Sequence, residues 1–436
     1  MTSGIPNITK LPELWGKIKF TLLALVIYRV GAHIAAPGVN VEAMANFLET
    51  QAQGTVFGLY DLFSGGGFSR VAVFALGIMP YISASIVFQL AGPVFPIIEK
   101  MQRDEEGKKR LTQWTRYLTV VLCVFQAYGF ALFAETAIPG AVAHPGMLFR
   151  LQTVAILTTG GVFIMWLGEQ ITERGIGNGM SLLIFFSIIE RLWPELLRTF
   201  EAIGSGSVSV TRLIVVVGFM VLVVAGTVAV VVAARRIPIQ IPRKVLGRGR
   251  IREGTKTFIP LRINSSGVMP IIFAQSLIIV PGTLATFTGA PWLQEVAQYF
   301  NVTSPIYIVS STLLILFFAY FYTSIIFNPV DLAENLKKQG GFIPGVRPGA
   351  ATADYIDDIL SRITLPGALF LAFVAMLPIV VFNVLNMPFQ FGGTALLIVV
   401  GVALDTVQQV QQHMILRQYD GFMKEGRVKF RGRGRL

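Results

Sequence analysis

The sequence predicts an all-α polytopic membrane protein with ten transmembrane helices in two pseudo-symmetric, inverted halves. Three observations lead to this fold class. Of the 436 residues, 53% are hydrophobic and only 14% are charged, whereas soluble domains carry about a quarter charged residues. Apolar stretches of about 20 residues, long enough to cross a bilayer, recur along the chain. The Lys and Arg residues behind the net charge of +12 are concentrated between alternate stretches. The composition excludes a soluble globular chain.

Ten apolar stretches are long enough to span the hydrocarbon core. Their ranges are 18–36, 71–92, 114–134, 150–168, 180–198, 212–234, 267–288, 305–327, 364–384 and 394–414. The first stretch begins at about Phe20 and lacks a small-residue cleavage pattern. We therefore expect it to remain in the membrane rather than to be removed as a signal peptide.

The distribution of basic residues predicts the orientation. An even number of spans places both termini on one side, and the segments on that side hold 30 of the 36 Lys and Arg residues. The opposite loops contain no Lys or Arg at 39–57, 135–149, 289–304 and 385–393. Because cytoplasmic loops are enriched in Lys and Arg, we expect both termini to be cytoplasmic.

Ten spans divide into five plus five, and an odd number per half gives the halves opposite membrane orientations. The predicted halves are residues 1–200, with spans one to five, and residues 201–436, with spans six to ten. Inverted repeats of this kind are typical of channels and transporters, whose pathway lies at the interface of the repeats. We therefore expect a central pore between the halves.

A short apolar segment interrupts the pattern between spans one and two. As a helix, residues 55–63 would rise about 14 Å, too little to cross a core of about 30 Å. Ser64, Gly65, Gly66 and Gly67 follow and allow the chain to fold back. The segment is predicted to be a re-entrant half-helix, which would form a plug or a filter; the alternative is a helix lying on the outer surface of the bilayer.

The predicted cytoplasmic loops 235–265 and 328–363 are long, and the tail 415–436 is basic. The first loop alternates basic and β-branched residues like a hairpin; its basic residues include Arg243, Lys244, Arg248, Arg250 and Arg252. The second loop carries Arg347 between two Pro-Gly pairs. Two interpretations stay open: topology determinants that contact anionic lipids, or a docking surface for a nucleic-acid-rich or acidic macromolecule.

No catalytic, metal or cofactor site is predicted. Gly107-Lys108-Lys109 lacks the hydroxyl residue and the upstream glycine of a phosphate-binding loop, and Met180 stands where a dinucleotide fingerprint requires glycine. The spans contain almost no central ionisable pair. Arg29 and Arg70 lie near outer ends of spans, where snorkelling to the interface explains them.

Several motifs now identify a resemblance that extends over nearly the whole chain. They are Arg29-Val-Gly31 with Pro37-Gly38; Phe63-Ser64-Gly65-Gly66; Phe74 to Ser85 (FALGIMPYISAS); Trp166 to Gly179 (WLGEQITERGIGNG); Phe327-Asn328-Pro329 with Asn335-Leu-Lys337-Lys338; Pro344 to Gly349 (PGVRPG); and Phe391-Gly392-Gly393-Thr394. In this order and topology, the sequence resembles bacterial members of the SecY family of protein-conducting channels.

The resemblance implies an hourglass pore between spans one to five and six to ten, closed outside by a plug formed by the half-helix. The implied plug residues are Tyr60, Asp61, Leu62, Phe63, Ser64, Gly65, Gly66 and Gly67. The implied pore ring is Ile78, Ile82, Met180, Ile184, Ile272 and Ile398. Such an apolar ring loses its water and blocks ions, yet it offers no fixed hydrogen-bond partner to a passing polypeptide. Met180 replaces the usual branched aliphatic residue, which makes the ring softer.

The resemblance also implies a lateral gate between spans two and seven, through which signal helices would pass into lipid. Polar residues there would pair across the closed seam; they are Ser83, Ser85 and Gln89 on span two, and Gln275 and Ser276 on span seven. Ordinary helix packing is the alternative explanation for these small and polar residues.

The implied location is the cytoplasmic (inner) membrane, and the implied partners are macromolecular. They are the small membrane subunits SecE and SecG, the motor ATPase SecA, the ribosome through its RNA, secretory polypeptides with signal sequences, and anionic lipids. Docking is assigned to Arg347, Arg248, Arg250, Arg252, Arg243 and Lys244. The competing hypothesis is an inverted-repeat secondary transporter of a small solute, which would place a charge pair at the midplane.

Overall fold

The computed structural model describes residues 12–425 except 51–55, 137, 139, 207–208, 241–243, 247–249, 253–255, 265, 289–294, 296–298, 303 and 385–392. Its helices are α1 (Pro12–Gly31), α2 (Val41–Thr50), α3 (Val56–Phe63), α4 (Met79–Val94), α5 (Pro96–Arg103), α6 (Glu105–Thr136), α7 (Met147–Arg174), α8 (Gly179–Gly204), α9 (Val210–Val232), α10 (Met269–Thr288), α12 (Pro305–Ile326), α13 (Pro329–Lys338), α14 (Ala350–Val384) and α15 (Gly393–Glu425). The strands are β1 (Ala234–Gln240), β2 (Lys244–Leu246), β3 (Arg250–Arg252) and β4 (Lys256–Arg262).

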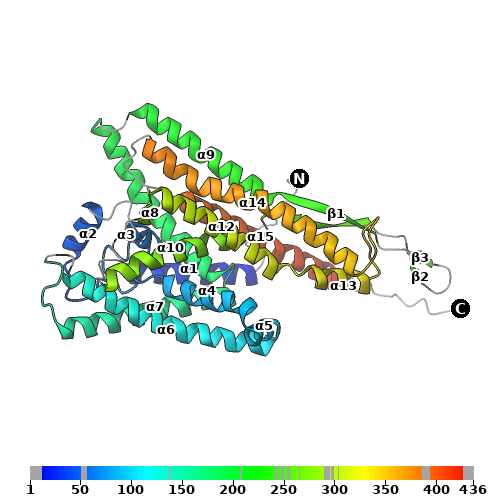
Figure 1. The fold of residues 1–436 in the computed structure, drawn as a ribbon, viewed down its shortest axis with the longest axis horizontal. Coiled ribbons are helices and arrows are strands. Elements are labelled where there is room, and N and C mark those ends of the chain that lie inside the picture. The colour runs from blue at the N-terminus through cyan, green and yellow to red at the C-terminus, as the bar shows by residue number, and fades with distance from the viewer. Residues whose placement is uncertain are drawn as a thin grey trace.

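Each of the ten predicted spans overlaps a helix, and the long helices run side by side along the molecule (Figure 1). Within the described residues, six helices are long and apolar enough to cross a membrane, or seven if α4 and α5, bent by 109°, form one span. Helices α1, α8 and α10 fall outside this set. Helices α1 and α8 carry charged residues, among them Arg29 and Glu190, and the apolar part of α10, Met269–Thr283, is shorter. The chain is thus an all-α polytopic membrane protein.

The beginning of the second span was predicted wrongly. The helix starts at Met79 rather than at 71, with Pro80 in its first turn, because residues 71–73 pair with the chain after α1. The Ala36 amide donates to the Val71 carbonyl at 2.8 Å, and the Val73 amide donates to the Ile34 carbonyl at 2.8 Å. The same pairing ends the first helix at Gly31 instead of 36.

Helix α2 was not predicted, because residues 39–57 read as a loop. Asn40 precedes the helix, and its side chain accepts from the Glu42 amide at 3.1 Å. Met44 and Leu48 are buried in the main core. The helix is therefore held by an apolar stripe too short to be recognised as a span.

The predicted basic hairpin is confirmed. Strands β1 and β4 pair antiparallel from Ala234 with Arg262 to Gln240 with Lys256, and β2 pairs with β3. The hairpin projects from one end of the helix bundle (Figure 1).

Segment 328–363 was expected to be a loop and is largely helical. Helix α13 fills its first part, and α14 begins at Ala350, well before the predicted span at 364. The hairpin packs on both helices through a second apolar core of Ile237, Ile239, Leu261, Leu336, Ile343, Ile356, Ile359 and Leu360. These buried contacts make helix favourable where the polar sequence alone indicated a loop.

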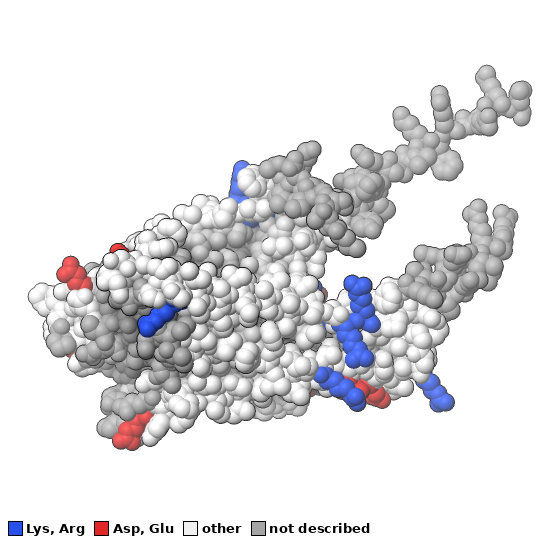
Figure 2. All heavy atoms as spheres, turned by 90° about the horizontal axis from the view of Figure 1, so that it is seen from above, with Lys and Arg blue, Asp and Glu red and all other residues white. Residues whose placement is uncertain are grey.

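The expected tail likewise begins later than predicted, because α15 continues to Glu425; residues 426–436 lie outside the described part. On the face in Figure 2, the Lys and Arg side chains gather mainly toward the end that carries the hairpin, and the broad middle is largely uncharged. This distribution fits a protein whose middle lies in lipid.

Candidate functional site

Helix α3 and the turn after it lie inside the bundle, packed against α8 and α10. Asp61 and Ser64 are each 1% exposed. The chain reverses at Gly65 and Gly66, whose φ angles are +66° and +75°, and the Gly66 amide donates to the Asp61 carbonyl at 2.9 Å. A re-entrant segment of this kind requires surrounding protein, which α8 and α10 provide.

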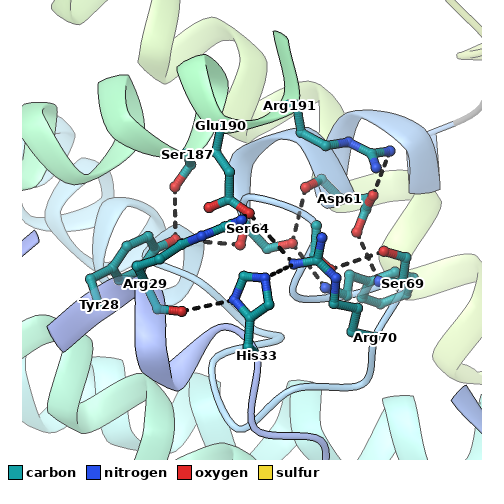
Figure 3. A network of polar contacts seen from close by, with 12 residues as sticks. Tyr28, Arg29, His33, Asp61, Ser64, Ser69, Arg70, Ser187, Glu190 and Arg191 are labelled. Carbon is teal, nitrogen blue, oxygen red and sulfur yellow. Dashed lines mark hydrogen bonds and ion pairs between the residues drawn. The ribbon is translucent and has the colours of Figure 1, made fainter. Parts of the chain in front are cut away.

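A charged network attaches this segment to α8 (Figure 3). Arg191 Nη2 lies 2.7 Å from Asp61 Oδ2, and the Ser69 amide donates to Asp61 Oδ1 at 2.8 Å. The preceding residue on α8, Glu190, forms ion pairs with Arg29 of α1 and with Arg70, whose Nη1 lies 3.5 Å from Glu190 Oε1. The Asp61 and Glu190 side chains are 1% and 9% exposed, so both carboxylates are buried and ion-paired.

This network corrects the interpretation of Arg29 and Arg70 as snorkelling residues, because both pair with the buried Glu190. His33 also contacts Arg70, with 3.0 Å between Nε2 and Nη1. The available signal was the adjacent Glu190 and Arg191 within a predicted span, because charges there need partners. Their partners lie more than 100 residues away in sequence, so no local pattern identifies them.

The six expected ring residues are apolar and lie in or against the interior of the helix bundle. Ile78 caps α4 rather than lying within it, and Ile82 follows on α4. Ile184, Ile272 and Ile398 are at most 2% exposed. All five isoleucines belong to the main core, and Met180 packs against it.

A cavity of about 290 Å³ lies beside part of this ring. Met180, Ile184 and Ile272 line it, together with polar residues such as Gln89. The ion pair between Arg116 Nε and Glu169 Oε1, at 2.8 Å, contributes to the same lining. The cavity lining therefore combines apolar side chains, ring residues among them, with polar and charged ones.

Helices α4 and α10 are in contact, as a gate between spans two and seven requires. Across this seam the Ser276 hydroxyl lies 3.7 Å from Met79 Sδ, and it also donates to the Ile272 carbonyl at 2.8 Å. Ser83 is half-buried on α4.

The expected pairing of the other polar gate residues is wrong. Gln89 bonds to Ser85 on its own helix at 2.7 Å and accepts from Tyr322 of α12. Gln275 accepts from Tyr307 of α12 at 3.2 Å. Helix α12 therefore supplies a tyrosine partner to each of the two glutamines.

The expected docking residues are only partly described. Arg347 is exposed on a turn flanked by Gly345 and Gly349, with φ angles of +85° and +109°. Lys244 and Arg252 are paired in register on β2 and β3, and Arg250 is the first residue of β3. Arg243 and Arg248 lie outside the described residues.

No group of three or more His, Cys, Asp or Glu side chains that could hold a metal ion occurs within the described part of the chain. Cys123 is buried and unpaired with another cysteine.

Comparison with known proteins gives one consistent family. The SecY family model matches residues 72–407. The chain is 42% identical over 431 residues to the protein translocase subunit SecY of Aquifex aeolicus, covering 97% of this chain and 100% of that one.

Solved structures share the fold. A structure concerning the plug domain of a SecY protein, described as stabilising the closed state of the translocation channel and maintaining a membrane seal, matches with a TM-score of 0.67 and 18% identity, over 98% of this chain and 99% of that one. Sec61 in the canine ribosome–channel complex from the endoplasmic reticulum matches with a TM-score of 0.64 and 17% identity, over 98% and 99% of the two chains.

Proposed function

Because this chain belongs to the SecY family, it is a subunit of a protein translocation channel, and we propose that its polypeptide path runs between residues 1–200 and 201–436. The observation that carries this proposal is the set of buried apolar side chains from α4, α8, α10 and α15, with the re-entrant segment packed beside it. Apolar side chains exclude ions when they meet, and they bind no particular side chain when a polypeptide separates them.

We infer that residues 56–67 form the plug that closes this path. The segment is buried and contacts α8 and α10, the helices that carry Ile184 and Ile272. It is short and contains a glycine turn, so it is able to move without unfolding a spanning helix. In the related structure named above, the plug domain maintains a membrane seal.

The α4–α10 seam is the proposed lateral gate for signal and transmembrane helices. Ser276 and Met79 form a weak contact across the seam, and the remaining polar partners lie on α12. Opening would therefore separate α4 from α10 and break the bond between Gln89 of α4 and Tyr322 of α12, while Gln275 stays bonded to Tyr307.

The exposed Arg347 turn and the basic hairpin are the proposed docking surface for the ribosome or for the motor ATPase SecA, which would drive translocation. Ribosomal RNA is a polyanion, and such contacts are strongly salt-dependent. The Sec61 relative was solved on a ribosome. SecE, SecG and anionic lipids complete the proposed assembly in the cytoplasmic membrane, with both termini on the cytoplasmic side.

Site-specific crosslinking tests the path. A photoreactive residue is placed at Ile82 or Ile398, and at the exposed Val215 of α9 as a matched control. A secretory polypeptide is then stalled during passage. We expect it to crosslink to both ring positions and not to Val215; crosslinks to Val215 alone would exclude the proposed path.

The small-solute transporter is not favoured. None of the relatives described above is a small-solute transporter. One ion pair joins Asp61 of the plug segment to Arg191 of α8, and another joins Arg29 of α1 to Glu190 of α8, an arrangement that restrains a segment of chain rather than forming a solute site.

A further inference from the structure

We propose that Glu190 and Arg191 of α8 form a charged clamp that holds the plug segment, residues 56–67, in its closed position, through one contact within the segment and one just after it. This inference rests on the proposed function of that segment as the plug. The clamp is a pair of positioning residues, because neither needs to touch the translocating polypeptide.

The first argument is geometric. Adjacent residues on a helix point about 100° apart, so Glu190 and Arg191 reach different parts of the same segment (Figure 3). Arg191 binds Asp61, inside α3, at 2.7 Å. Glu190 binds Arg70, just after the glycine turn, at 3.5 Å. The two contacts have opposite polarity, so they fix the direction in which the segment lies on α8 as well as its position.

The second argument concerns close packing at the turn. A Cβ atom at Gly65 would lie 3.3 Å from Ser187 Cα and 3.3 Å from Glu190 Oε2. The turn therefore sits directly on α8, one helical turn before the clamp. Displacing the plug from α8 must separate the Arg191–Asp61 pair, and it pulls on Arg70, which follows the segment directly after the turn.

The third argument concerns the surroundings of each charged group before and after the plug is displaced. The Arg191 and Arg70 side chains are 29% and 33% exposed, so both are less buried than Asp61 before the plug moves. Glu190 keeps a second cation, Arg29 of α1, which is not part of the plug. Asp61, which is 1% exposed, becomes hydrated only after displacement. When a buried ion pair is exchanged for two hydrated charges, the change in free energy is small. A small change suits a plug that must open and close repeatedly.

The test measures resting ion conductance of the purified complex in planar bilayers. Arg191→Glu places two carboxylates together, and we expect the conductance to rise about tenfold or more, because an unpaired buried charge is strongly destabilising. Adding Asp61→Lys restores opposite charges, and the seal should return to within about twofold of the wild type. Arg212→Glu, an exposed change at the start of α9, is the matched control and should leave the conductance unchanged.

Two milder variants keep the test decisive if Arg191→Glu fails to fold. Arg191→Gln leaves the Asp61 charge unpaired and should raise the conductance, while Arg191→Gln with Asp61→Asn should return it toward the wild type. If either double variant conducts ions as strongly as the corresponding single Arg191 variant, the clamp is overturned.

Deletion of residues 60–67 separates this inference from the function on which it rests. If the deletion leaves the conductance unchanged, the segment is not the plug and the proposed function fails. If the deletion raises the conductance and Arg191→Glu does not, the plug assignment holds and the clamp alone is overturned. If both raise it and the reversed pair restores the seal, the clamp is supported.

Discussion

The phenol oxygen of Tyr28 lies 2.7 Å from the hydroxyl oxygen of Ser187, joining α1 to α8 where the plug segment turns back. The same phenol lies 3.4 Å from the Ser64 carbonyl oxygen, and Tyr28 is 1% exposed. Neutral hydrogen bonds thus restrain the turn on the side away from Asp61. These bonds are independent of the ion pairs and respond differently to mutation.

Tyr28→Phe is therefore expected to weaken closure without affecting the charges. Losing a buried hydrogen bond costs about 1 kcal/mol, so the variant should unfold at a slightly lower temperature in detergent and show a modest rise in resting conductance. Tyr117→Phe is the matched control, because Tyr117 is 69% exposed. Equal melting temperatures for the Tyr28 variant and the wild type would contradict the prediction.

A charge in the apolar ring should hydrate it. Ile82 is 5% exposed and belongs to the main core. Ile82→Asp is expected to raise resting ion conductance, since a carboxylate retains water where the isoleucine excludes it. Ile82→Val removes one methyl group and should keep the seal, at a stability cost of about 1 kcal/mol. If the Ile82→Asp variant folds and stays sealed, Ile82 does not belong to the constriction.

Arg347→Glu should separate docking from sealing. Arg347 is exposed on its glycine-flanked turn, so its replacement disturbs no buried contact. We expect SecA-driven translocation to fall severalfold while the resting conductance stays at the wild-type level. Lys337, on α13, is also exposed. The variant Lys337→Glu tests whether the overall basic charge of this surface, rather than Arg347 itself, is enough for docking. Equal losses from both variants would point to overall electrostatic attraction, and normal translocation by Arg347→Glu would remove the turn from the docking surface.

Gly160→Ala should destabilise the fold through overpacking. A Cβ atom at Gly160 on α7 would overlap the backbone carbonyl oxygen of Val73, which lies in the segment that precedes α4. Because backbone cannot move aside as a side chain can, the expected cost is about 1–3 kcal/mol. Gly218→Ala on α9 is the control, since nothing lies within 4 Å of its Cβ position. Thermal unfolding of the two variants checks this difference, and equal stabilities would contradict it.

Several features were predictable because they depend on local composition. The ten spans follow from apolar length, and the hairpin follows from alternation between basic and β-branched residues. The half-helix at α3 follows from an apolar run too short to span the bilayer and from the glycines after it. The ring positions rest on family resemblance, and they stay a prediction; in the structure the five isoleucines lie in the main core and Met180 packs against it.

Other features depend on contacts between distant segments, and there the predictions failed. Residues 71–78 are apolar enough for a helix, but bonds to Ile34 and Ala36 hold their beginning in a different conformation. The segment 328–363 is polar enough for a loop, but packing against the hairpin makes it helical. The gate glutamine Gln89 was expected to face α10, but Tyr322 of α12 binds it instead.

The sequence by itself determined that this chain crosses a membrane repeatedly, which helices cross it, and where a short segment turns back. These properties follow from the transfer of apolar residues into lipid and from the need of glycine at a sharp reversal. Only the tertiary structure decided that Glu190 and Arg191 bind Arg70 and Asp61. A buried charge requires a partner, but the identity of that partner depends on which helices pack together.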